Sequence, residues 1–209
     1  YTVTVTDFNG CTTSVSAVID PAVPMTVICS STNVTCNGAA NGSIKFNVAN
    51  YAGGYNATLS PVAGTLTKTA GLVTVTGLAP GTYTLNVTDA ITNCTASAPV
   101  QVIQPASLAL SVVSNVHANC NTGAKVTVNA TGGTPVYTYA FVADNVTPAV
   151  ADYTTSASAV LPVSLPTPNN YDVWVKDNNG CTYKLDIVVN LDASPIIVLP
   201  VAQCYVGTP

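Results

Sequence analysis

The chain has 209 residues, with five lysines, nine aspartates, no arginine and no glutamate, for a net charge of −4. A few scattered lysines on an acidic chain argue against a nucleic-acid partner and against a polybasic membrane-binding patch. Mean hydropathy is positive, but no run approaches about 18 consecutive apolar residues, so no membrane insertion is expected. Valine and threonine abound while strong helix formers are scarce, which favours strands over helices.

A sequence pattern occurs three times along the chain. It consists of a tyrosine, an alternating strand, an aspartate that begins a turn, and a cysteine. Its tyrosines are Tyr1, Tyr83 and Tyr171, its aspartates Asp7, Asp89 and Asp177, and its cysteines Cys11, Cys94 and Cys181. A second cysteine series, Cys36, Cys120 and Cys204, has spacings of 84 and 84. The period of about 85 residues is the size of an immunoglobulin-like domain.

The repeat divides the chain into four parts. Residues 1–22 are interpreted as the last strands of an upstream repeat, and residues 196–209 as the first strand of a downstream one. Between them lie two whole repeats, residues 23–106 and 107–195. The chain is therefore expected to be a piece of a longer tandem array.

Each whole repeat is predicted to consist of short strands. In the first, the turn at 77–81 leads into the strand that starts at Tyr83. In the second, the alternating segment 125–131 is followed by the segments 136–142, 171–176 and 181–189, and an Asn-Gly turn joins the last two as a hairpin. Many short strands with no helix between them predict an all-β fold of tandem immunoglobulin-like antiparallel β-sandwiches.

Seven cysteines without a CxxC motif predict disulfides and an oxidising compartment. Each whole repeat has one cysteine before its second strand and one before its last. The repeat therefore suggests two pairings, Cys36 with Cys94 and Cys120 with Cys181. Cys11 and Cys204 are then half-bridges to missing repeats. Cys29 has no counterpart in the other repeats, so it is free, pairs alternatively with Cys11, or links two chains.

Three phrases resemble the SprB-type repeat of large surface adhesins in gliding Bacteroidetes, which the type IX system secretes. They lie at residues 34–38 (Val-Thr-Cys-Asn-Gly), 77–83 (Gly-Leu-Ala-Pro-Gly-Thr-Tyr) and 3–11. In the second repeat, residues 117–123 and 165–169 depart from these forms. The resemblance implies cell-surface display, adhesion and gliding motility, and it implies no catalytic residue.

No residues of the chain form a convincing catalytic, cofactor or metal site. His117 is the only histidine, and no Gly-x-Ser-x-Gly nucleophile motif accompanies it. The aspartates form no Asp-x-Asp-x-Asp calcium loop. Asp7, Asp89 and Asp177 each precede a turn, where an aspartate typically accepts hydrogen bonds from nearby backbone amides. They are therefore interpreted as structural, and no cofactor is expected.

Trp174 is the candidate interface residue. Strand alternation places Tyr171, Val173 and Val175 on one face, and Trp174 on the opposite face between Asp172 and Lys176. A lone tryptophan on a solvent face is a frequent interface anchor. We expect Trp174 to pack against a neighbouring domain or chain; the alternative is that it is a partly exposed cross-strand partner.

These observations predict a secreted, non-enzymatic stretch of a bacterial surface adhesin or extracellular filament, acting as structural stalk and adhesion module. Its expected partners are neighbouring repeats or identical chains, with surface glycans as a further candidate. One alternative is a carbohydrate-binding module, which needs a row of exposed aromatic side chains. The other is an accessory region of a secreted hydrolase, whose catalytic domain would have to lie elsewhere in the parent chain.

Overall fold

The computed structural model describes residues 1–19, 21–119, 121–164 and 167–192. These residues form two compact units: unit 1 contains residues 1–33 and 40–102, and unit 2 contains residues 34–39 and those from 103 onward. The chain therefore passes from one unit to the other three times, after Asn33, after Ala39 and after Val102. No helix among the described residues is long and apolar enough to cross a membrane.

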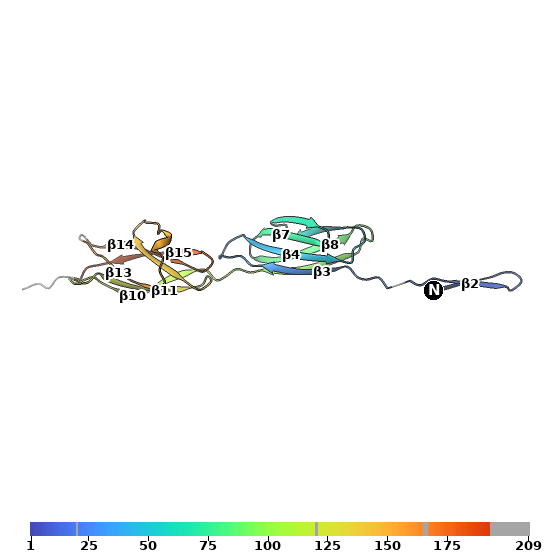
Figure 1. Ribbon diagram of the computed structural model, residues 1–209, viewed down its shortest axis with the longest axis horizontal. Helices are drawn as coiled ribbons and strands as arrows, with labels where there is room; N and C mark the ends of the chain where they lie inside the picture. Colours follow the sequence, from blue (N-terminus) through green and yellow to red (C-terminus); the bar gives the residue numbers. More distant parts are fainter. Residues whose placement is uncertain (20, 120, 165–166, 193–209) are drawn as a thin grey trace, which may run out of the picture. The chain divides into compact units, whose positions relative to one another are not determined.

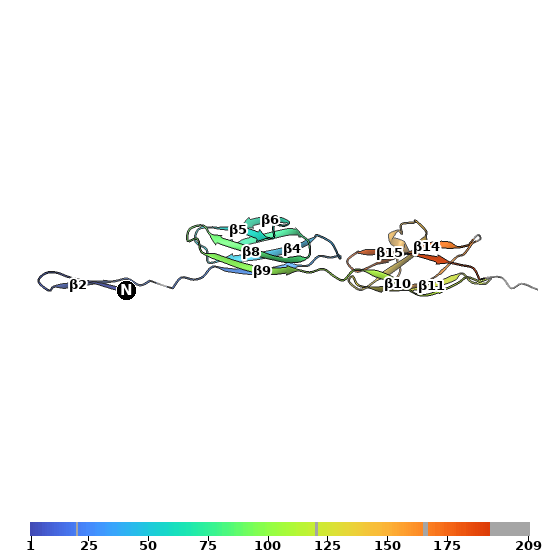
Figure 2. The same ribbon diagram turned by 180° about the vertical axis from the view of Figure 1, so that it is seen from behind.

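Unit 1 has two antiparallel sheets. The first contains, in spatial order, β3 (Thr26–Thr32), β4 (Gly42–Ala49), β7 (Leu72–Leu78) and β6 (Thr65–Thr69). The second contains β5 (Tyr55–Ser60), β8 (Gly81–Asp89) and β9 (Thr95–Val102). β3, β4 and β7 are labelled in Figure 1, and β5, β6, β8 and β9 in Figure 2, which shows the unit from behind.

Period-two alternation builds the core of unit 1. In β4 every second side chain is buried, among them Ile44 and Phe46, whereas Lys45 and Asn47 between them are exposed. Leu85 and Val87 of β8 alternate in the same way and are also buried. Since successive side chains of a strand point to opposite faces, one face of each sheet supplies the core of the sandwich.

The first two strands form a separate two-stranded sheet. β1 (Thr2–Thr6) pairs with β2 (Thr12–Ser16), and every side chain of both strands is exposed. Their turn contains Asp7 and Cys11, in the sequence pattern that occurs again after β8 and β14. The interpretation of residues 1–22 as the end of an upstream repeat stays a prediction.

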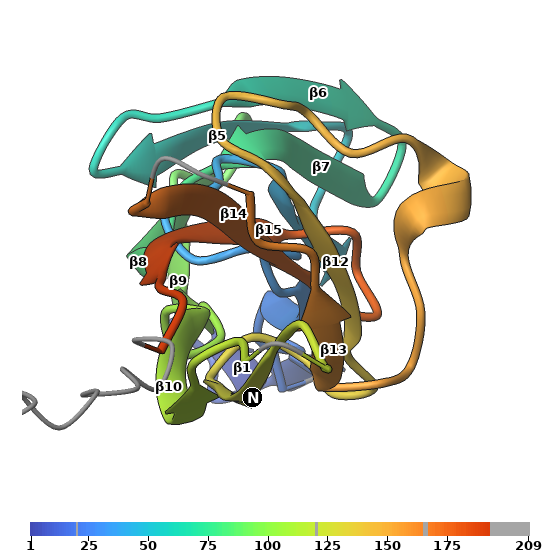
Figure 3. The ribbon, with the colours of Figure 1, turned by 90° about the vertical axis from the view of Figure 1, so that its left-hand side faces the viewer.

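Unit 2 is a second sandwich, with three antiparallel strands in each sheet. One sheet contains β10 (Ala109–Val116), β11 (Ala124–Thr131) and β13 (Ser158–Leu161). The other contains β12 (Thr138–Ala143), β14 (Asn169–Lys176) and β15 (Thr182–Val189). A 3-10 turn, η1 (Val150–Asp152), interrupts the connection from β12 to β13. Figure 3 shows the second sheet above β10 and β13.

Valines dominate the core of unit 2. Val126 from one sheet and Val173, Val175 and Val189 from the other have no measurable exposure. β-branched side chains suit this position because they fit closely against the pleated surface of a sheet. The predicted all-β fold of tandem immunoglobulin-like sandwiches is confirmed.

The units differ from the expected repeats, 23–106 and 107–195: unit 1 also contains the residues before 23, and unit 2 resumes at Ile103. The segment Val34–Ala39 lies between β3 and β4 in the sequence, yet it belongs to unit 2. The expected downstream strand at 196–209 lies outside the described residues.

Candidate functional site

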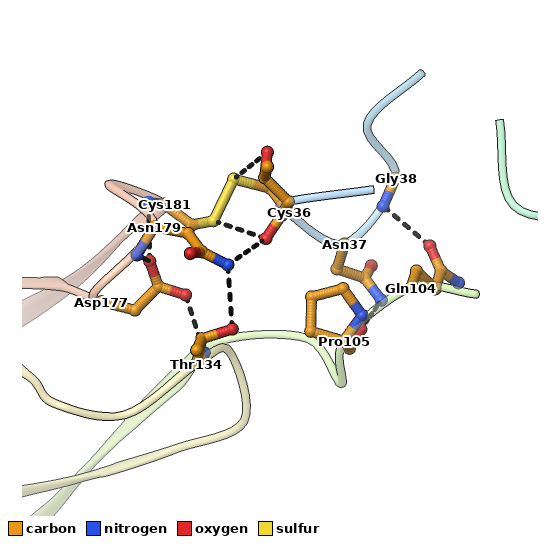
Figure 4. The surroundings of a disulfide bond; sticks show 10 residues. Cys36, Asn37, Gly38, Gln104, Pro105, Thr134, Asp177, Asn179 and Cys181 are labelled. Carbon is orange, nitrogen blue, oxygen red and sulfur yellow. Dashed lines mark hydrogen bonds between the residues drawn. A yellow bond between two sulfur atoms is a disulfide. The ribbon is translucent and has the colours of Figure 1, made fainter. Parts of the chain in front are cut away.

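The segment Val34–Ala39 is fixed against the start of unit 2 by hydrogen bonds. The Val34 amide donates to the Ile103 carbonyl at 3.2 Å, the Asn37 side-chain amide donates to the Pro105 carbonyl at 3.0 Å, and the Gly38 amide donates to Gln104 Oε1 at 2.8 Å. Val34 is buried. These contacts, of which those of Asn37 and Gly38 are seen in Figure 4, give the segment a defined conformation.

A tight turn then presents Cys36. The Ala39 amide donates to the Cys36 carbonyl at 3.1 Å, and Gly38 at the third position of the turn has a φ of 76°. This is the pattern of a type II turn, which needs a positive φ at that position and so favours glycine.

A disulfide joins Cys36 to Cys181 (Figure 4). The two Cα atoms lie 5.7 Å apart, within the normal range for such a bond, and the two cysteines are 145 residues apart in sequence. Both residues belong to unit 2. By the sequence repeat, however, Cys36 comes from the first whole repeat and Cys181 from the second. The bond therefore joins two segments that the sequence analysis assigns to consecutive repeats.

Asp177 fixes the turn on which Cys181 lies. Its Oδ1 accepts hydrogen bonds from the amides of Asn179 and Cys181, both at 2.9 Å, and its Oδ2 accepts one from the amide of Thr134 at 2.8 Å. Asn179 then donates from its side chain to the Thr35 carbonyl and to Thr134 Oγ1, both at 3.0 Å. The carboxylate of Asp177 is buried and satisfied entirely by these groups of unit 2. It holds the cysteine where Cys36 can reach it.

The same type of turn occurs at Asp89 in unit 1. Asp89 Oδ1 accepts hydrogen bonds from the amides of Ile91 and Thr92 at 2.8 Å, and its Oδ2 accepts one from the amide of Ala52. These backbone donors, of which Thr92 and Ala52 contribute most, lower the pKa of Asp89 to about 2, because they favour the charged carboxylate. The structural interpretation of the repeated aspartates agrees with these contacts.

The depressed pKa of Asp89 predicts an acid-labile unit 1. Since the folded-state pKa lies below the unfolded one, the stabilisation is complete above about pH 4 and is lost as the pH falls toward 2. Asp89→Asn mimics the protonated side chain, so the difference in unfolding free energy between it and the unsubstituted chain should shrink over this range. Urea unfolding followed by circular dichroism at pH 5, 4, 3 and 2 measures the difference. A difference independent of pH contradicts the role of the Asp89 charge.

The expected pairing of Cys36 with Cys94 and of Cys120 with Cys181 is wrong. Cys36 is bonded to Cys181, and Cys94 is an exposed free thiol, as is Cys11. Cys36 lies on the segment that joins unit 2, whereas Cys94 lies at the β8–β9 turn of unit 1. The 84-residue spacing of the cysteines is compatible with Cys36–Cys94 and with Cys36–Cys181 alike, so the sequence pattern does not decide between these two bonds. Cys120 and Cys204 lie outside the described residues.

Cys29 is a free, half-buried thiol on β3. Its Sγ lies 3.6 Å from the Pro99 carbonyl, and its register partner in the sheet is Phe46. Cys29 is therefore not bonded to Cys11 within this chain, and the expectation that it links two chains stays a prediction.

The alternation expected around Trp174 is confirmed, but the exposure of its face is not. Val173 and Val175 are in the core, with Tyr171 packed against it. On the opposite face Asp172 is buried and Trp174 is only half-buried, between its register partners Ala140 and Lys184. Its indole Nε1 is buried and, among the described residues, has no hydrogen-bond partner.

Residues between β12 and β13, together with Lys184, contact this face. The amide of Asn145 donates to Asp172 Oδ2 at 3.1 Å, and the ring of Tyr153 lies 4.0 Å from the ammonium of Lys176. Lys184 Nζ is 3.3 Å from Asp172 and 2.6 Å from Asp186. These two carboxylates, Asp186 foremost, raise the pKa of Lys184. The Trp174 side chain is therefore a half-buried cross-strand partner, and its role at an interface stays a prediction.

Trp174→Thr should accordingly destabilise unit 2 by about 2 kcal/mol, since a half-buried indole loses part of the 3–5 kcal/mol of a fully buried one. Thermal unfolding followed by circular dichroism measures this. The matched control is Val188→Thr, an exposed position on β15, which should change stability little. If the two variants are equally stable, the Trp174 side chain contributes no more to the stability of unit 2 than an exposed side chain does.

His117 lies beside an acidic side chain, but no nucleophile motif accompanies it in the sequence. Its Nδ1 lies 3.2 Å from Asp192 Oδ1, and both side chains are exposed. Among the residues that the structure describes, no three His, Cys, Asp or Glu side chains gather as metal ligands would. The chemically distinctive site of the chain is therefore the disulfide and the aspartate turn that supports it.

Fold and site together define a tandem immunoglobulin-like β-sandwich protein with a disulfide in its second unit. Residues 29–64 match the SprB repeat family model, which confirms the resemblance seen in the sequence. The matched segment includes Cys36 and its turn. No curated protein sequence matches the chain.

Several solved structures are similar to this chain at low identity. The titin domains I67–I69 are 12% identical, with 80% of this chain and 65% of that chain covered and a TM-score of 0.43. Three N-terminal domains of the bacteriophage RB49 Hoc capsid protein are 15% identical (80% and 59% covered, TM-score 0.46). Drosophila OTK extracellular domains 3–5 are 11% identical (92% and 70% covered, TM-score 0.40). The chain spans 65% of the titin fragment's length.

Proposed function

We propose that this chain is a non-enzymatic extracellular repeat segment of a bacterial surface adhesin or filament, in which it serves as structural stalk and adhesion module. The SprB match at residues 29–64 supports an adhesin-type repeat. Two consecutive β-sandwiches and a disulfide, which persists in oxidising compartments, support an extracellular array. Gliding motility follows from the family resemblance alone.

The Cys36–Cys181 bond is the observation that favours a stalk. A pull applied at the two ends of the chain passes from Cys36 through the sulfur atoms to Cys181. The residues between them, which include most of unit 1 and most of unit 2, are thereby removed from the path of the force. Such a bond limits how far the segment can lengthen under load, which is what a surface stalk requires.

Single-molecule force spectroscopy on the chain, held at its two ends, tests this function. The closed loop spans 145 residues, so breaking the bond should release about 500 Å of additional contour length at 3.3–3.6 Å per residue. The gain should appear with dithiothreitol or with Cys36→Ala/Cys181→Ala. The control Cys11→Ala/Cys94→Ala removes two free thiols and should behave as the unsubstituted chain does. Full extension under oxidising conditions would contradict a force-limiting role.

Surface display is tested separately. Antibodies raised against the chain should label intact cells of the source organism as strongly as permeabilised ones. Labelling that requires permeabilisation would overturn the extracellular assignment.

A further inference from the structure

Three hairpin turns of the chain have the same hydrogen bond between an aspartate and a cysteine. The amides of Asp7, Asp89 and Asp177 donate to the carbonyls of Cys11, Cys94 and Cys181, at 2.9, 2.8 and 3.0 Å respectively. In each turn, the aspartate Oδ1 also accepts hydrogen bonds from amides within the turn. The three turns therefore place a cysteine at an equivalent position, one hydrogen bond from an aspartate.

The three cysteines differ in whether they are bonded. Cys181 is bonded to Cys36, which the sequence repeat assigns to the preceding repeat, whereas Cys94 and Cys11 are exposed thiols. Cys94 occupies in its repeat the position that Cys181 occupies in the next one. If the same pairing occurs in every repeat, the partner of Cys94 is the cysteine at the Cys36 position one repeat earlier, upstream of residue 1. Cys29 is not that partner, because it lies on β3 in unit 1, outside the 34–39 segment.

We propose that Cys94 forms a disulfide with a cysteine in the Cys36 position of a preceding repeat of the same kind, so that every pair of consecutive repeats is covalently joined. This inference rests on the proposed function as a segment of a tandem array. The partner is a repeat with a Val-Thr-Cys-Asn-Gly turn like that of residues 34–38. Asp89 contacts Cys94 through its own backbone amide, which donates to the Cys94 carbonyl, as the Asp177 amide does to Cys181.

Each bond is a two-electron oxidation. Two thiols lose two protons and two electrons and form one S–S bond. A low-molecular-weight disulfide such as oxidised glutathione accepts the electrons and protons through thiol–disulfide exchange and becomes two thiols. Cys94 is exposed and can undergo this exchange.

A chain in which residues 23–105 are present twice in tandem supplies the missing neighbour. The second copy adds Cys29, Cys36 and Cys94. After refolding with oxidised glutathione and removal of the excess, thiols are titrated in the duplicated chain and in the 209-residue chain. One new disulfide makes the thiol count rise by one, whereas no new disulfide makes it rise by three. A rise of three overturns the proposal.

Two variants of the duplicated chain identify the bonded cysteine. Cys94→Ser in the second copy should free the first-copy Cys36 and raise the thiol count by one. Cys94→Ser in the first copy should remove a free thiol and lower the count by one. The opposite pattern means that the bond forms within a repeat, which also overturns the proposal.

The 209-residue chain itself gives a second measurement that does not depend on folding of the duplicate. A peptide of residues 33–40, offered with oxidised glutathione, should form a mixed disulfide with Cys94 in preference to Cys29. Equal labelling of the two counts against the proposal. Neither measurement depends on surface display or on load, so this inference can fail while the stalk function stands, and the reverse also holds.

Discussion

Replacing Cys36 and Cys181 together by alanine is expected to lower the free energy of unfolding of unit 2 by about 4 kcal/mol, because loops of this length constrain the unfolded chain strongly. Removal of a native disulfide from a small secreted domain typically costs about 2–5 kcal/mol. The effect is large because a small sandwich buries a limited fraction of its surface and has little stability in reserve. Trp174, the only tryptophan, lies in unit 2, so its fluorescence during urea unfolding reports on that unit.

The control for this experiment is Cys11→Ala/Cys94→Ala. It removes two thiols that are free in the structure and should leave the urea midpoint of unit 2 unchanged. Reduction of the unsubstituted chain should reproduce the effect of the Cys36/Cys181 variant. Equal midpoints for the oxidised and reduced chains would show that the bond does not stabilise unit 2.

Asp177→Ala is expected to destabilise unit 2 by about 3 kcal/mol. The substitution leaves the amides of Thr134, Asn179 and Cys181 without their acceptor, and hydrogen bonds to a charged group contribute about 1.5–3 kcal/mol each without being additive. It should also slow formation of the Cys36–Cys181 bond during oxidative refolding, since the turn no longer holds Cys181 in place. Trp174 fluorescence and peptide mapping of quenched refolding samples measure the two effects.

Asp7→Ala is the matched control, because Asp7 accepts from the amides of Asn9 and Cys11 in an exposed turn. It should leave the stability of unit 2 within about 0.5 kcal/mol of the starting value, as surface substitutions usually do. If Asp177→Ala is as mild as Asp7→Ala, the buried carboxylate does not support the turn.

Much of the local structure could be predicted from the sequence. The segment 125–131 is β11 with one residue added at its start, and the segments 171–176 and 181–189 are the hairpin of β14 and β15. The aspartates before the turns accept backbone hydrogen bonds, as their positions indicated. These features depend on contacts between residues close in sequence, for which alternation and turn chemistry are sufficient signals.

The candidate site was predicted only in part. Cys36 and Cys181 were identified as disulfide-forming, although with other partners, and residues 34–38 were singled out only by the family resemblance. The assignment of residues 34–39 to unit 2 was not foreseen, because it depends on hydrogen bonds to Ile103, Gln104 and Pro105, which lie 66 to 69 residues further along the chain.

The sequence by itself determined the repeat, the strand type and the turns, because these arise from the chemistry of neighbouring residues. Only the tertiary structure decided which cysteines are bonded and whether the Trp174 face is free. A disulfide needs two Cα atoms within about 7 Å, wherever they lie in the sequence. Cys36 meets Cys181 because its segment joins unit 2, and Trp174 is half-buried within a face that residues between β12 and β13 contact. Both outcomes depend on the packing of distant segments, which a period of about 85 residues leaves open.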